Sequence, residues 1–509
     1  MNPLAQKRFL KLIKPDGTDG MAERERILQA LGREDISIPV RVLQTLYPLV
    51  ADADYEITVT LSPAQHGWEI VRVEAGDTTA RLFGAALDIG STTLEMALLD
   101  LHSGAVLANS QLVNSQRALG ENILDRIVAV REDAANLEVL RSCAVADITQ
   151  LLRLCCQEAE IDAEEIGVLV VAGNTTMMHF LFGCDPWLVF QNPYSPAFFN
   201  PGIVRAQELE LPLVCNVFSM PAVANYLGAD ITSGLLMTDL DSRSEPAMLL
   251  DIGTNGELAF GCRDYLLLGA GAAGPALEGA VSEYGMRAEP GAICAVTIDQ
   301  NNQLHCETIG DQPPKGICGS GIMDLIAQGF LAGWISGDGS LNPERSERIM
   351  PVWSKLHERQ LPAIMYAPGL YFTEADLKEW IKCKAAAFTM VATLLDHCGL
   401  TKDDIGRLYL AGGFGTHYHL ESAVTTGLYP DIPRDRFTVL GNSSLKGAML
   451  LLTDRDQLCR LQHFQDHGVY LQFGEMERFL ENMIAAEFLP HTDRSLYPSV
   501  VTVSESVGS

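Results

Sequence analysis

Two stretches of the chain repeat the same order of apolar and polar positions. Residues 86–95 and 249–258 each contain an apolar run that ends in Asp, then a turn rich in Gly, hydroxyl and amide side chains, and then apolar residues again. This pattern predicts a strand, a tight turn and a second strand in both places. A single hairpin of this kind is common, but two copies indicate a duplicated fold.

The duplication extends beyond these hairpins. Residues 120–127 match residues 319–326, and both segments predict the start of a helix. Residues 161–174 match residues 400–413, where a capped acidic turn precedes a buried strand that ends in a Gly turn. Because the three blocks come in the same order twice, we expect an α/β fold with two equivalent lobes.

Weaker patterns divide the rest of the chain. Residues 22–31 predict a helix ended by Gly32, residues 40–49 predict a second helix, and residues 56–61 and 68–73 alternate like strands. An acidic stretch at 238–246 separates the two halves, and the second half is longer because of a Gly- and Ala-rich insertion at 270–293. The expected segments are an N-terminal helical appendage (1–35), a small α+β linker module (36–84), a first lobe (85–238), a second lobe (246–485) and a polar tail (486–509), disordered from 502 onwards.

Composition narrows the functional classes. Of the 509 residues 47% are apolar, which suffices for several cores, and 65 acidic against 36 basic residues give a net charge of −29. This charge repels nucleic acid and anionic membrane surfaces, so we expect neither as a partner. No apolar run approaches the roughly 18 residues of a membrane span, and the N-terminus lacks a signal-peptide core, so we expect a cytoplasmic protein.

The cysteines and histidines indicate no obvious metal centre. The 12 cysteines are scattered without a C-x-x-C pair, which predicts reduced thiols and neither a disulfide framework nor a zinc or iron–sulfur ligand set. His417 and His419 could reach a metal together, but histidines near a Gly turn more often form hydrogen bonds at the surface. The sequence also lacks G-x-x-x-x-G-K-[ST], which excludes a P-loop ATPase.

The two D-I-G turns predict phosphate binding. Gly allows backbone N–H groups to approach an anion, neighbouring hydroxyls add donors, and an Asp at the end of a strand suits Mg²⁺ held with its waters. Asp88 and Asp251 are therefore the candidate magnesium residues.

Several motifs together resemble one protein family. Residues 251–257, 273–279, 316–321, 412–415 and 441–448 are similar to the reductive activators of corrinoid proteins, within the superfamily of actin, hexokinase and the heat-shock chaperones. The resemblance covers about residues 22–485. It implies an actin-like ATPase fold of two duplicated ribonuclease-H-like lobes around a nucleotide cleft, with a small N-terminal linker module.

The resemblance also implies the site residues. The two phosphate loops, which should face each other across the cleft, would contain Asp88, Gly90, Ser91, Thr92 and Thr93 in the first and Asp251, Gly253, Thr254, Asn255 and Gly256 in the second. Gly319, Ser320 and Gly321 would open a helix toward phosphate or ribose, and Gly412 with Gly413 would lie beneath the adenosine. Asp251 would orient the attacking water, with Glu257 and Glu278 as substitutes. Glu257 could instead face solvent from its strand.

The implied function is an ATPase that couples nucleotide turnover to returning the Co(II) corrinoid of a partner protein to Co(I). Family members normally carry an iron–sulfur ferredoxin domain, whereas this chain begins where the family's linker begins and its cysteines lack cluster spacing. We therefore expect ATP and Mg²⁺ as cofactors, no iron–sulfur cluster in this chain, and a separate ferredoxin-like electron donor. The alternatives are a small-molecule kinase of the same superfamily and a non-catalytic, nucleotide-gated interaction protein. A homodimer is compatible with the sequence, which does not give the oligomeric state.

Overall fold

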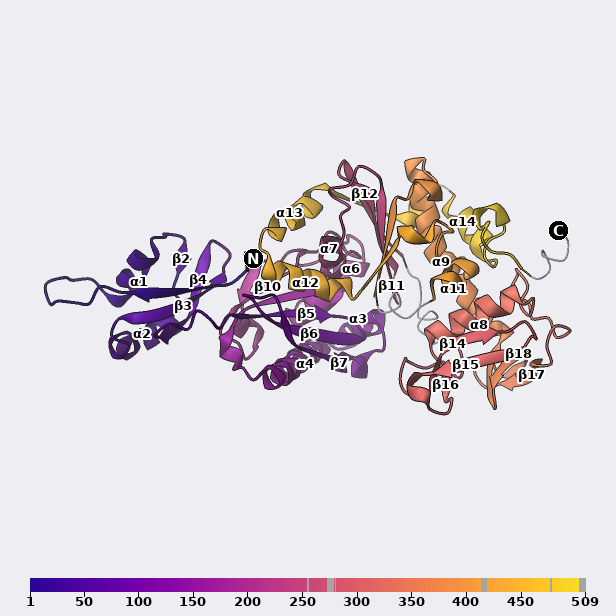
Figure 1. The fold of residues 1–509 in the computed structure, drawn as a ribbon, viewed down its shortest axis with the longest axis horizontal. Helices are drawn as coiled ribbons and strands as arrows, with labels where there is room; N and C mark the ends of the chain where they lie inside the picture. Colours follow the sequence, from indigo (N-terminus) through magenta and orange to yellow (C-terminus); the bar gives the residue numbers. More distant parts are fainter. Residues whose placement is uncertain (254–255, 272–278, 280, 413–418, 477, 503–509) are drawn as a thin grey trace. The chain divides into compact units, whose positions relative to one another are not determined.

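A computed structural model describes residues 1–253, 256–271, 279, 281–412, 419–476 and 478–502 (Figure 1). The chain forms two compact units, Met1–Asp239 with Ser443–Gly468, and Leu240–Asn442 with Val469–Ser509. The first unit combines a small N-terminal module with a larger sheet, and the second unit contains one large and two small sheets.

The N-terminal module is a four-stranded sheet in the order β1-β3-β4-β2 with two helices. Its elements are β1 (Gln6–Lys11), α1 (Glu23–Leu31), β2 (Ile36–Ser37), α2 (Val40–Asp52), β3 (Glu56–Pro63) and β4 (Trp68–Ala75). Both predicted helices and both predicted strands are present, and Gly32 ends α1 with a φ of 63°.

The strand β1 was not predicted, and it changes the expected division of the N-terminal region. It pairs with β3 from Gln6↔Leu61 to Lys11↔Glu56, so residues 1–35 and 36–84 share one sheet. Because β1 is an edge strand that buries only Leu10, its sequence is mostly polar and carries no apolar alternation.

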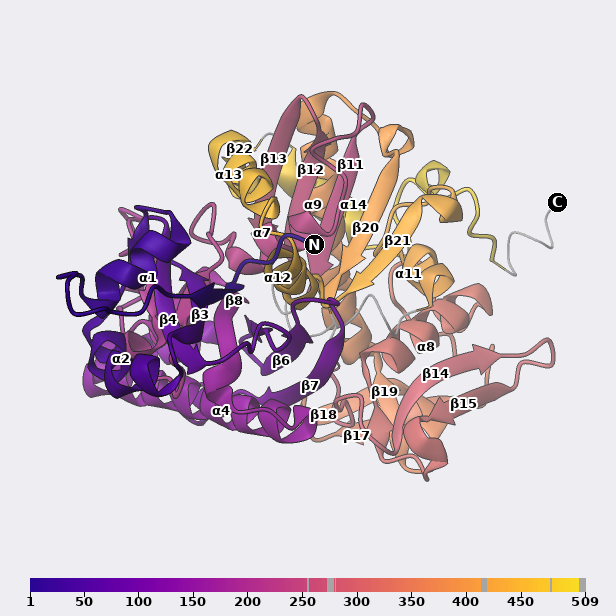
Figure 2. The same ribbon diagram turned by 60° about the vertical axis from the view of Figure 1, so that its left-hand side comes forward.

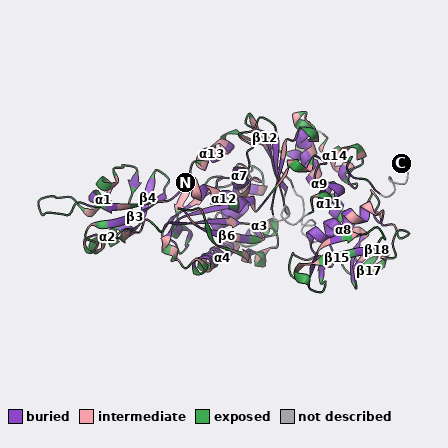
Figure 3. Cartoon of the chain, in the orientation of Figure 1, coloured by how far each residue is buried: buried purple, intermediate pink, exposed green. Residues whose placement is uncertain are grey.

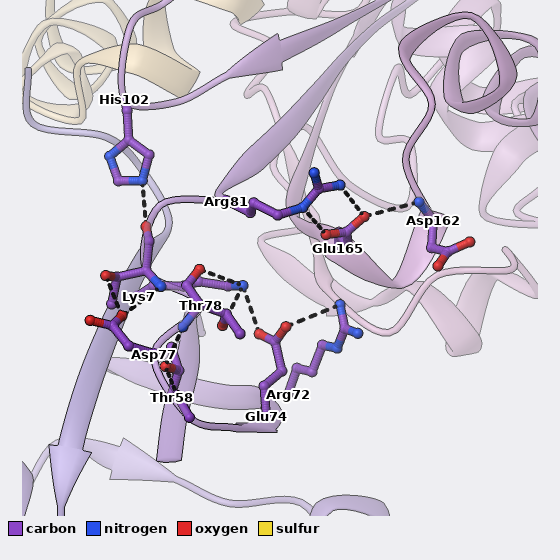
Figure 4. Close-up of polar contacts among 12 residues, drawn as sticks. Lys7, Thr58, Arg72, Glu74, Asp77, Thr78, Arg81, His102, Asp162 and Glu165 are labelled. Atoms are coloured by element: carbon purple, nitrogen blue, oxygen red, sulfur yellow. Dashed lines mark hydrogen bonds and ion pairs between the residues drawn. The ribbon is translucent and has the colours of Figure 1, made fainter. Parts of the chain in front are cut away.

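Polar contacts join the module to the lobe that follows it (Figure 4). Lys7 pairs with Glu74 at 2.6 Å and donates to the Thr78 hydroxyl at 3.1 Å, which ties β1 to the end of β4 and the connecting segment. Farther along that segment, Arg81 makes a two-pronged ion pair with Glu165 of the lobe, at 2.7 and 2.9 Å. Fork-to-carboxylate contacts of this kind fix orientation as well as distance.

The large sheet of the first unit has the order β7-β6-β5-β8-β10-β9. Its strands are β5 (Phe83–Ile89), β6 (Thr93–Asp100), β7 (Val106–Val113), β8 (Ile166–Gly173), β9 (Ile203–Arg205) and β10 (Asn216–Ser219). The helices of this unit are η1 (Ser115–Leu119), α3 (Ile123–Glu132), α4 (Ala135–Ala159), η2 (Ala163–Glu165), α5 (Thr175–Leu181), α6 (Trp187–Phe190), η3 (Ala206–Leu209), α7 (Ala229–Leu236), α12 (Ser443–Thr453) and α13 (Gln457–His467).

Helices cover both faces of this sheet, and its central strands β5, β6 and β8 are largely buried (Figures 2 and 3). Along β5, Ala85 and Leu87 share a core with Leu140 and Ile148 of α4. Gly84, the residue before Ala85, faces Leu452 of α12, because successive strand residues point to opposite faces. The strand alternation therefore assigns α4 and α12 to different sides.

The large sheet of the second unit has the order β21-β20-β11-β12-β13-β22. Its strands are β11 (Ala247–Ile252), β12 (Gly256–Cys262), β13 (Tyr265–Gly271), β20 (Arg407–Ala411), β21 (Phe437–Gly441) and β22 (Gly468–Leu471). The two small sheets contain β14 (Ala292–Ile298), β15 (Leu304–Thr308), β16 (Gly316–Ile317), β17 (Ile349–Ser354), β18 (Arg359–Ala367) and β19 (Leu370–Thr373). The helices are η5 (Ile309–Asp311), α8 (Gly319–Leu331), α9 (Glu374–Cys398), η6 (Lys402–Asp404), α11 (Leu420–Thr426), η7 (Arg434–Arg436), η8 (Phe473–Glu475), α14 (Phe479–Ala486) and η9 (Arg494–Leu496).

The two large sheets share one arrangement of five strands. In each, an antiparallel hairpin meander (β5-β6-β7 and β11-β12-β13) is extended by two parallel strands (β8 and β10, β20 and β21). The capped acidic turns also recur, with a capping box in η2 and another in η6. The duplicated α/β fold predicted from the repeated blocks is confirmed.

The segment 443–468 lies in the first unit, although its position in the sequence placed it in the expected second lobe, 246–485. Its helix α12 packs against α7, β5 and β8. At Gly447 the approach to α7 is so close that an added Cβ would lie 1.9 Å from the Ser233 carbonyl oxygen. An amphipathic pattern predicts a helix but not the sheet that the helix covers.

The expected polar tail, 486–509, is packed over its described residues. Leu489, Tyr497 and Val500 belong to the core of the second unit. The buried ammonium of Lys384 donates to the carbonyl oxygens of Ala486, Phe488 and Pro490, which uses all three of its donors. The apolar residues of this segment are too widely spaced to form the periodic pattern of a helix or strand, so the sequence predicts a polar tail here. Residues 503–509, for which disorder was expected, lie outside the described part of the chain.

Candidate functional site

The first predicted phosphate loop joins β5 to β6. Asp88 lies directly opposite Glu95 in the hairpin, and its carboxylate is partly exposed. Oδ1 of Asp88 accepts a 2.7 Å hydrogen bond from the hydroxyl of Ser444, the second residue of α12. The sequence marked 441–448 as part of the family pattern but did not indicate that Ser444 contacts Asp88.

Three successive carbonyl groups of this loop point into the protein. The Gly90 oxygen accepts from Nδ2 of Asn114 at 2.9 Å, the Ser91 oxygen from Arg126 at 2.7 Å, and the Thr92 oxygen from the Asn114 backbone N–H at 2.9 Å. In a trans peptide the next N–H points the opposite way from the carbonyl. The N–H groups of Ser91 and Thr92 have no acceptor among the described residues, so they are available to an anion.

A second carboxylate lies at the same end of this sheet. Asp230, in the first turn of α7, lies beside the turn that follows β8, because a Cβ added to Gly228 would meet both Asn174 Cα (2.5 Å) and Asp230 Oδ1 (2.8 Å). Burial raises the pKa of Asp230 to about 6, whereas the N–H of Ile231 favours the charged form. The sequence did not single it out, since an Asp in the first turn of a helix is common.

The second predicted phosphate loop joins β11 to β12. Asp251 lies directly opposite Glu257, so their side chains are on the same face of the hairpin. Glu257 is only 9% exposed, which removes the alternative that it faces solvent. Gly253 follows β11 and Gly256 begins β12, whereas Thr254 and Asn255 lie outside the described residues.

The Gly turn after β20 lies against Asp251. Gly412 has a φ of +85°, and a Cβ added there would lie 2.6 Å from Oδ1 of Asp251. The equivalent Gly173 in the first unit packs against the end of β5, where an added Cβ would lie 2.8 Å from the Ile89 carbonyl oxygen. Both repeats therefore need a Gly where the parallel strand meets the end of the hairpin. Tyr429, whose pKa is raised by burial and then by the Asp251 charge, is a further neighbour that the sequence did not indicate.

The segment Gly319–Gly321 forms the buried first turn of α8, as predicted. The Ser320 hydroxyl donates to the Cys294 carbonyl at 2.8 Å, so this side chain stabilises the helix start against β14. Gly413 and Glu278 lie outside the described residues. The structure therefore brings together Asp251, Glu257 and Gly412 in the second unit, and Asp88 with loop 90–93 in the first.

His419 has a defined role in the structure, whereas His417 lies outside the described residues. Nδ1 of His419 lies 2.8 Å from Oδ2 of Asp324, a carboxylate of α8 that is 2% exposed. The same oxygen accepts from the Val296 N–H at 3.2 Å. This contact ties the start of α11 to α8. His419 therefore forms a hydrogen bond, which is the role that the sequence favoured over metal binding for histidines near a Gly turn.

The cysteines are free thiols throughout the chain. Among the described residues, no group of three or more His, Cys, Asp or Glu side chains is arranged to hold a metal ion. None of the helices in the described ranges has the length and apolar character needed to span a bilayer.

The duplicated sheets and their paired Asp-containing hairpins define the class of protein: a member of the actin-like ATPase superfamily. A model of the C-terminal domain of RACo, the ASKHA domain, matches residues 245–501, and models of the RACo middle region and linker region match residues 83–243 and 1–80. The chain belongs to the RACo family, the reductive activators of corrinoid proteins, and its ASKHA fold implies nucleotide binding.

Individual relatives agree with this assignment. The solved structure of a reductive activator for corrinoid, iron–sulfur protein is 35% identical, with a TM-score of 0.87 over 98% of this chain and 81% of that chain. The corrinoid activation enzyme RamQ of Eubacterium limosum is 29% identical over 390 residues, which are 74% of this chain and 65% of that protein. The [Co(II) methylated amine-specific corrinoid protein] reductase of Methanosarcina barkeri is 26% identical over 405 residues, or 74% of this chain and 71% of that protein. This chain thus spans slightly less than two thirds of the RamQ protein.

Proposed function

We propose that this protein is an ATP-dependent reductive activator that returns the Co(II) corrinoid of a partner protein to Co(I). The observation that carries the proposal is the similarity of nearly the whole chain, at 35% identity, to a reductive activator for corrinoid, iron–sulfur protein. The Asp residues of the paired hairpins support the proposal, because carboxylates of this kind suit the Mg²⁺ that accompanies ATP. The corrinoid protein is the substrate, and each Co(II) takes up one electron.

The residues of the first hairpin fit a magnesium-bound nucleotide. The outward N–H groups of Ser91 and Thr92 suit a phosphate oxygen, and Asp88 suits the water shell of Mg²⁺. In the second hairpin Asp251, which lies opposite Glu257, would orient the attacking water. Bound ATP would supply the free energy of hydrolysis, and the role of this chain is to bind it, position water and couple its turnover to the partner.

The remaining parts of the nucleotide site are proposals as well. Gly319, Ser320 and Gly321 would meet phosphate or ribose at the start of α8, and Gly412 with Gly413 would lie beneath the adenosine. Thr254 and Asn255 would complete the second loop, and Glu278 would be an alternative to Asp251. The prediction that the two loops face each other across a cleft stays a prediction.

We also propose that the electron comes from a separate ferredoxin-like protein. The scattered cysteines of this chain support that choice, since a cluster needs several thiolates at one point. Protein purified without oxygen should then contain no stoichiometric iron and show no cluster absorption. One cluster per chain would contradict this part of the proposal.

The central experiment mixes the protein with a Co(II) corrinoid protein encoded beside it and with Ti(III) as an external reductant, in the absence of oxygen. Co(I), followed by its absorption, should accumulate faster with Mg-ATP than without it, and the Asp88→Asn variant should remove the difference. If ATP accelerates the reduction of none of the neighbouring corrinoid proteins, the proposal fails. ATP-dependent phosphorylation of a small metabolite would then favour the alternative of a small-molecule kinase. Nucleotide binding without turnover would favour the alternative of a non-catalytic, nucleotide-gated interaction protein.

A further inference from the structure

Arg126, in α3, is a buried arginine directly behind the first phosphate loop. Its side chain is inaccessible to solvent, with an exposed fraction of 0%. Nε donates to the Gly120 oxygen at 2.9 Å, Nη1 to Oε1 of Gln116 at 3.3 Å, and Nη2 to the Ser91 oxygen at 2.7 Å. Gln116 is itself fully buried and donates to the Leu140 oxygen at 2.8 Å, so the guanidinium is fixed on several sides.

This cation has neutral partners. Among the described residues, no carboxylate forms an ion pair with Arg126. Burial lowers its pKa, while the more distant Glu121 and Asp125 favour the charged form. A guanidinium nevertheless stays protonated in proteins, so a full positive charge remains in the interior. Burying a charge without a partner is costly, which indicates that the position needs the charge and not only a side chain of this size.

The hydrogen bond from Arg126 determines which way the loop faces. Arg126 and Asn114 together turn the carbonyls of Gly90, Ser91 and Thr92 inward, and the N–H groups of Ser91 and Thr92 consequently point away from the interior. Without Arg126 the Ser91 carbonyl would lose its donor and could turn toward the ligand, where its partial negative charge would repel a phosphate.

We propose that Arg126 is a positioning residue for the first phosphate loop, and that it favours phosphate both by orienting the loop and by placing a positive charge behind it. This inference rests on the proposed nucleotide binding. Arg126 would favour the phosphate group of the ligand without contacting it. Both effects act on phosphate alone, so the loss of Arg126 should weaken the binding of ATP and leave the binding of adenosine unchanged.

The test compares Arg126→Met with Arg126→Lys. Methionine keeps most of the volume but removes the charge and the donors, and the Kd for ATP should rise about 10-fold or more, the range of one hydrogen bond to a charged group. Lysine restores the charge but not the fork, so its Kd for ATP should lie between those of Arg126→Met and the parent. The Kd for adenosine should change less than about twofold in both variants.

Arg141→Met is the matched control. Arg141 lies in the same unit and is also largely buried, but it pairs with Glu210 at 3.0 Å and with Glu138 at 3.0 Å. Its replacement should lower the melting temperature without changing the ratio of ATP to adenosine affinity.

The outcomes separate this inference from the proposed function. If the parent protein binds ATP and a folded Arg126→Met variant binds it equally well, or loses ATP and adenosine affinity alike, the positioning role is wrong. If Arg126→Met does not fold, Arg126→Lys decides in the same way. If the parent protein binds no nucleotide, the proposed function itself fails.

Discussion

The hydroxyl of Ser444 donates a 2.7 Å hydrogen bond to Oδ1 of Asp88, across most of the length of the chain. Ser444 follows β21, a strand of the second unit, in sequence, but α12 belongs to the first unit and begins beside the Asp88 hairpin. A proposed magnesium residue is therefore oriented by a helix that the sequence alone would assign to the other half.

This contact predicts a graded effect on ATP hydrolysis. Asp88→Asn, and likewise Asp251→Asn, should lower kcat by about 100-fold or more while leaving the fold intact, because an amide cannot replace the negative charge offered to Mg²⁺. Ser444→Ala leaves the carboxylate in place and removes only one donor, so its kcat should fall less than about 10-fold.

Ser103→Ala provides the comparison for Ser444→Ala. Ser103 donates to Asp100 at 2.9 Å, a contact of the same kind at the far end of β6. Steady-state hydrolysis by this variant should match that of the parent. Normal hydrolysis by both Asp variants would show that the site lies elsewhere.

Gly412→Ala should disturb both the backbone and Asp251. The left-handed φ of +85° costs an alanine about 1 kcal/mol, and the new Cβ would lie 2.6 Å from the Asp251 carboxylate. We expect a loss of both stability and ATP turnover, measured by thermal unfolding and steady-state hydrolysis.

Gly399→Ala separates the two effects. Gly399 has a φ of +67° at the end of α9, but an added Cβ would meet nothing within 4 Å. Its replacement should cost a similar stability and leave turnover unchanged. Equal ATP turnover in Gly412→Ala and Gly399→Ala would mean that the close approach of residue 412 to Asp251 does not affect hydrolysis.

Asp230→Asn should stabilise the protein in a pH-dependent way. Burial raises the pKa of Asp230 from 3.8 to about 6, so the folded state binds its proton more tightly than the unfolded chain does. Stability therefore falls as the pH rises from about 4 to about 6, because the charged carboxylate is then forced into the fold. At pH 7 the asparagine variant should be more stable by about 1 to 3 kcal/mol.

Urea unfolding at pH 7 and pH 4.5 measures this difference. The gain should shrink at the lower pH, where the parent carboxyl is protonated in the folded state. A gain of the same size at both values would exclude titration of Asp230 as its cause.

His419→Ala should destabilise the second unit by about 2 kcal/mol, because it leaves the buried Asp324 carboxylate without its side-chain hydrogen-bond partner. Oδ1 of Asp324 has no hydrogen-bond partner among the described residues, so the loss is poorly compensated. His419→Asn retains a donor near the Nδ1 position and should recover part of the stability.

His357→Ala is the matched comparison in the same unit. Nε2 of His357 lies 2.9 Å from Oδ1 of Asp376, whose second oxygen keeps the backbone N–H of Thr373. This variant should therefore lose less stability than His419→Ala in thermal unfolding. The reverse order would contradict the role assigned to the Asp324 pair.

The amino-acid sequence was enough to predict the local elements and their duplication. Apolar runs ending in Asp and Gly predicted both hairpins, and the acidic turns before residues 166 and 407 predicted the capped strands β8 and β20. These features depend on neighbouring residues, such as the φ that only glycine adopts easily or a side chain that caps the next turn, so they can be recognised without the fold. The family pattern added the order of the motifs.

The contacts between distant segments depend on how the folded chain packs. This packing places Ser444 on Asp88, Gly412 against Asp251 and Arg126 behind the Ser91 carbonyl, and it pairs the polar strand β1 with β3. None of these contacts leaves a periodic signal, because each depends on which surface a helix or strand covers once the chain is packed. Periodicity records which face of an element is buried, and the fold alone determines what that face is buried against.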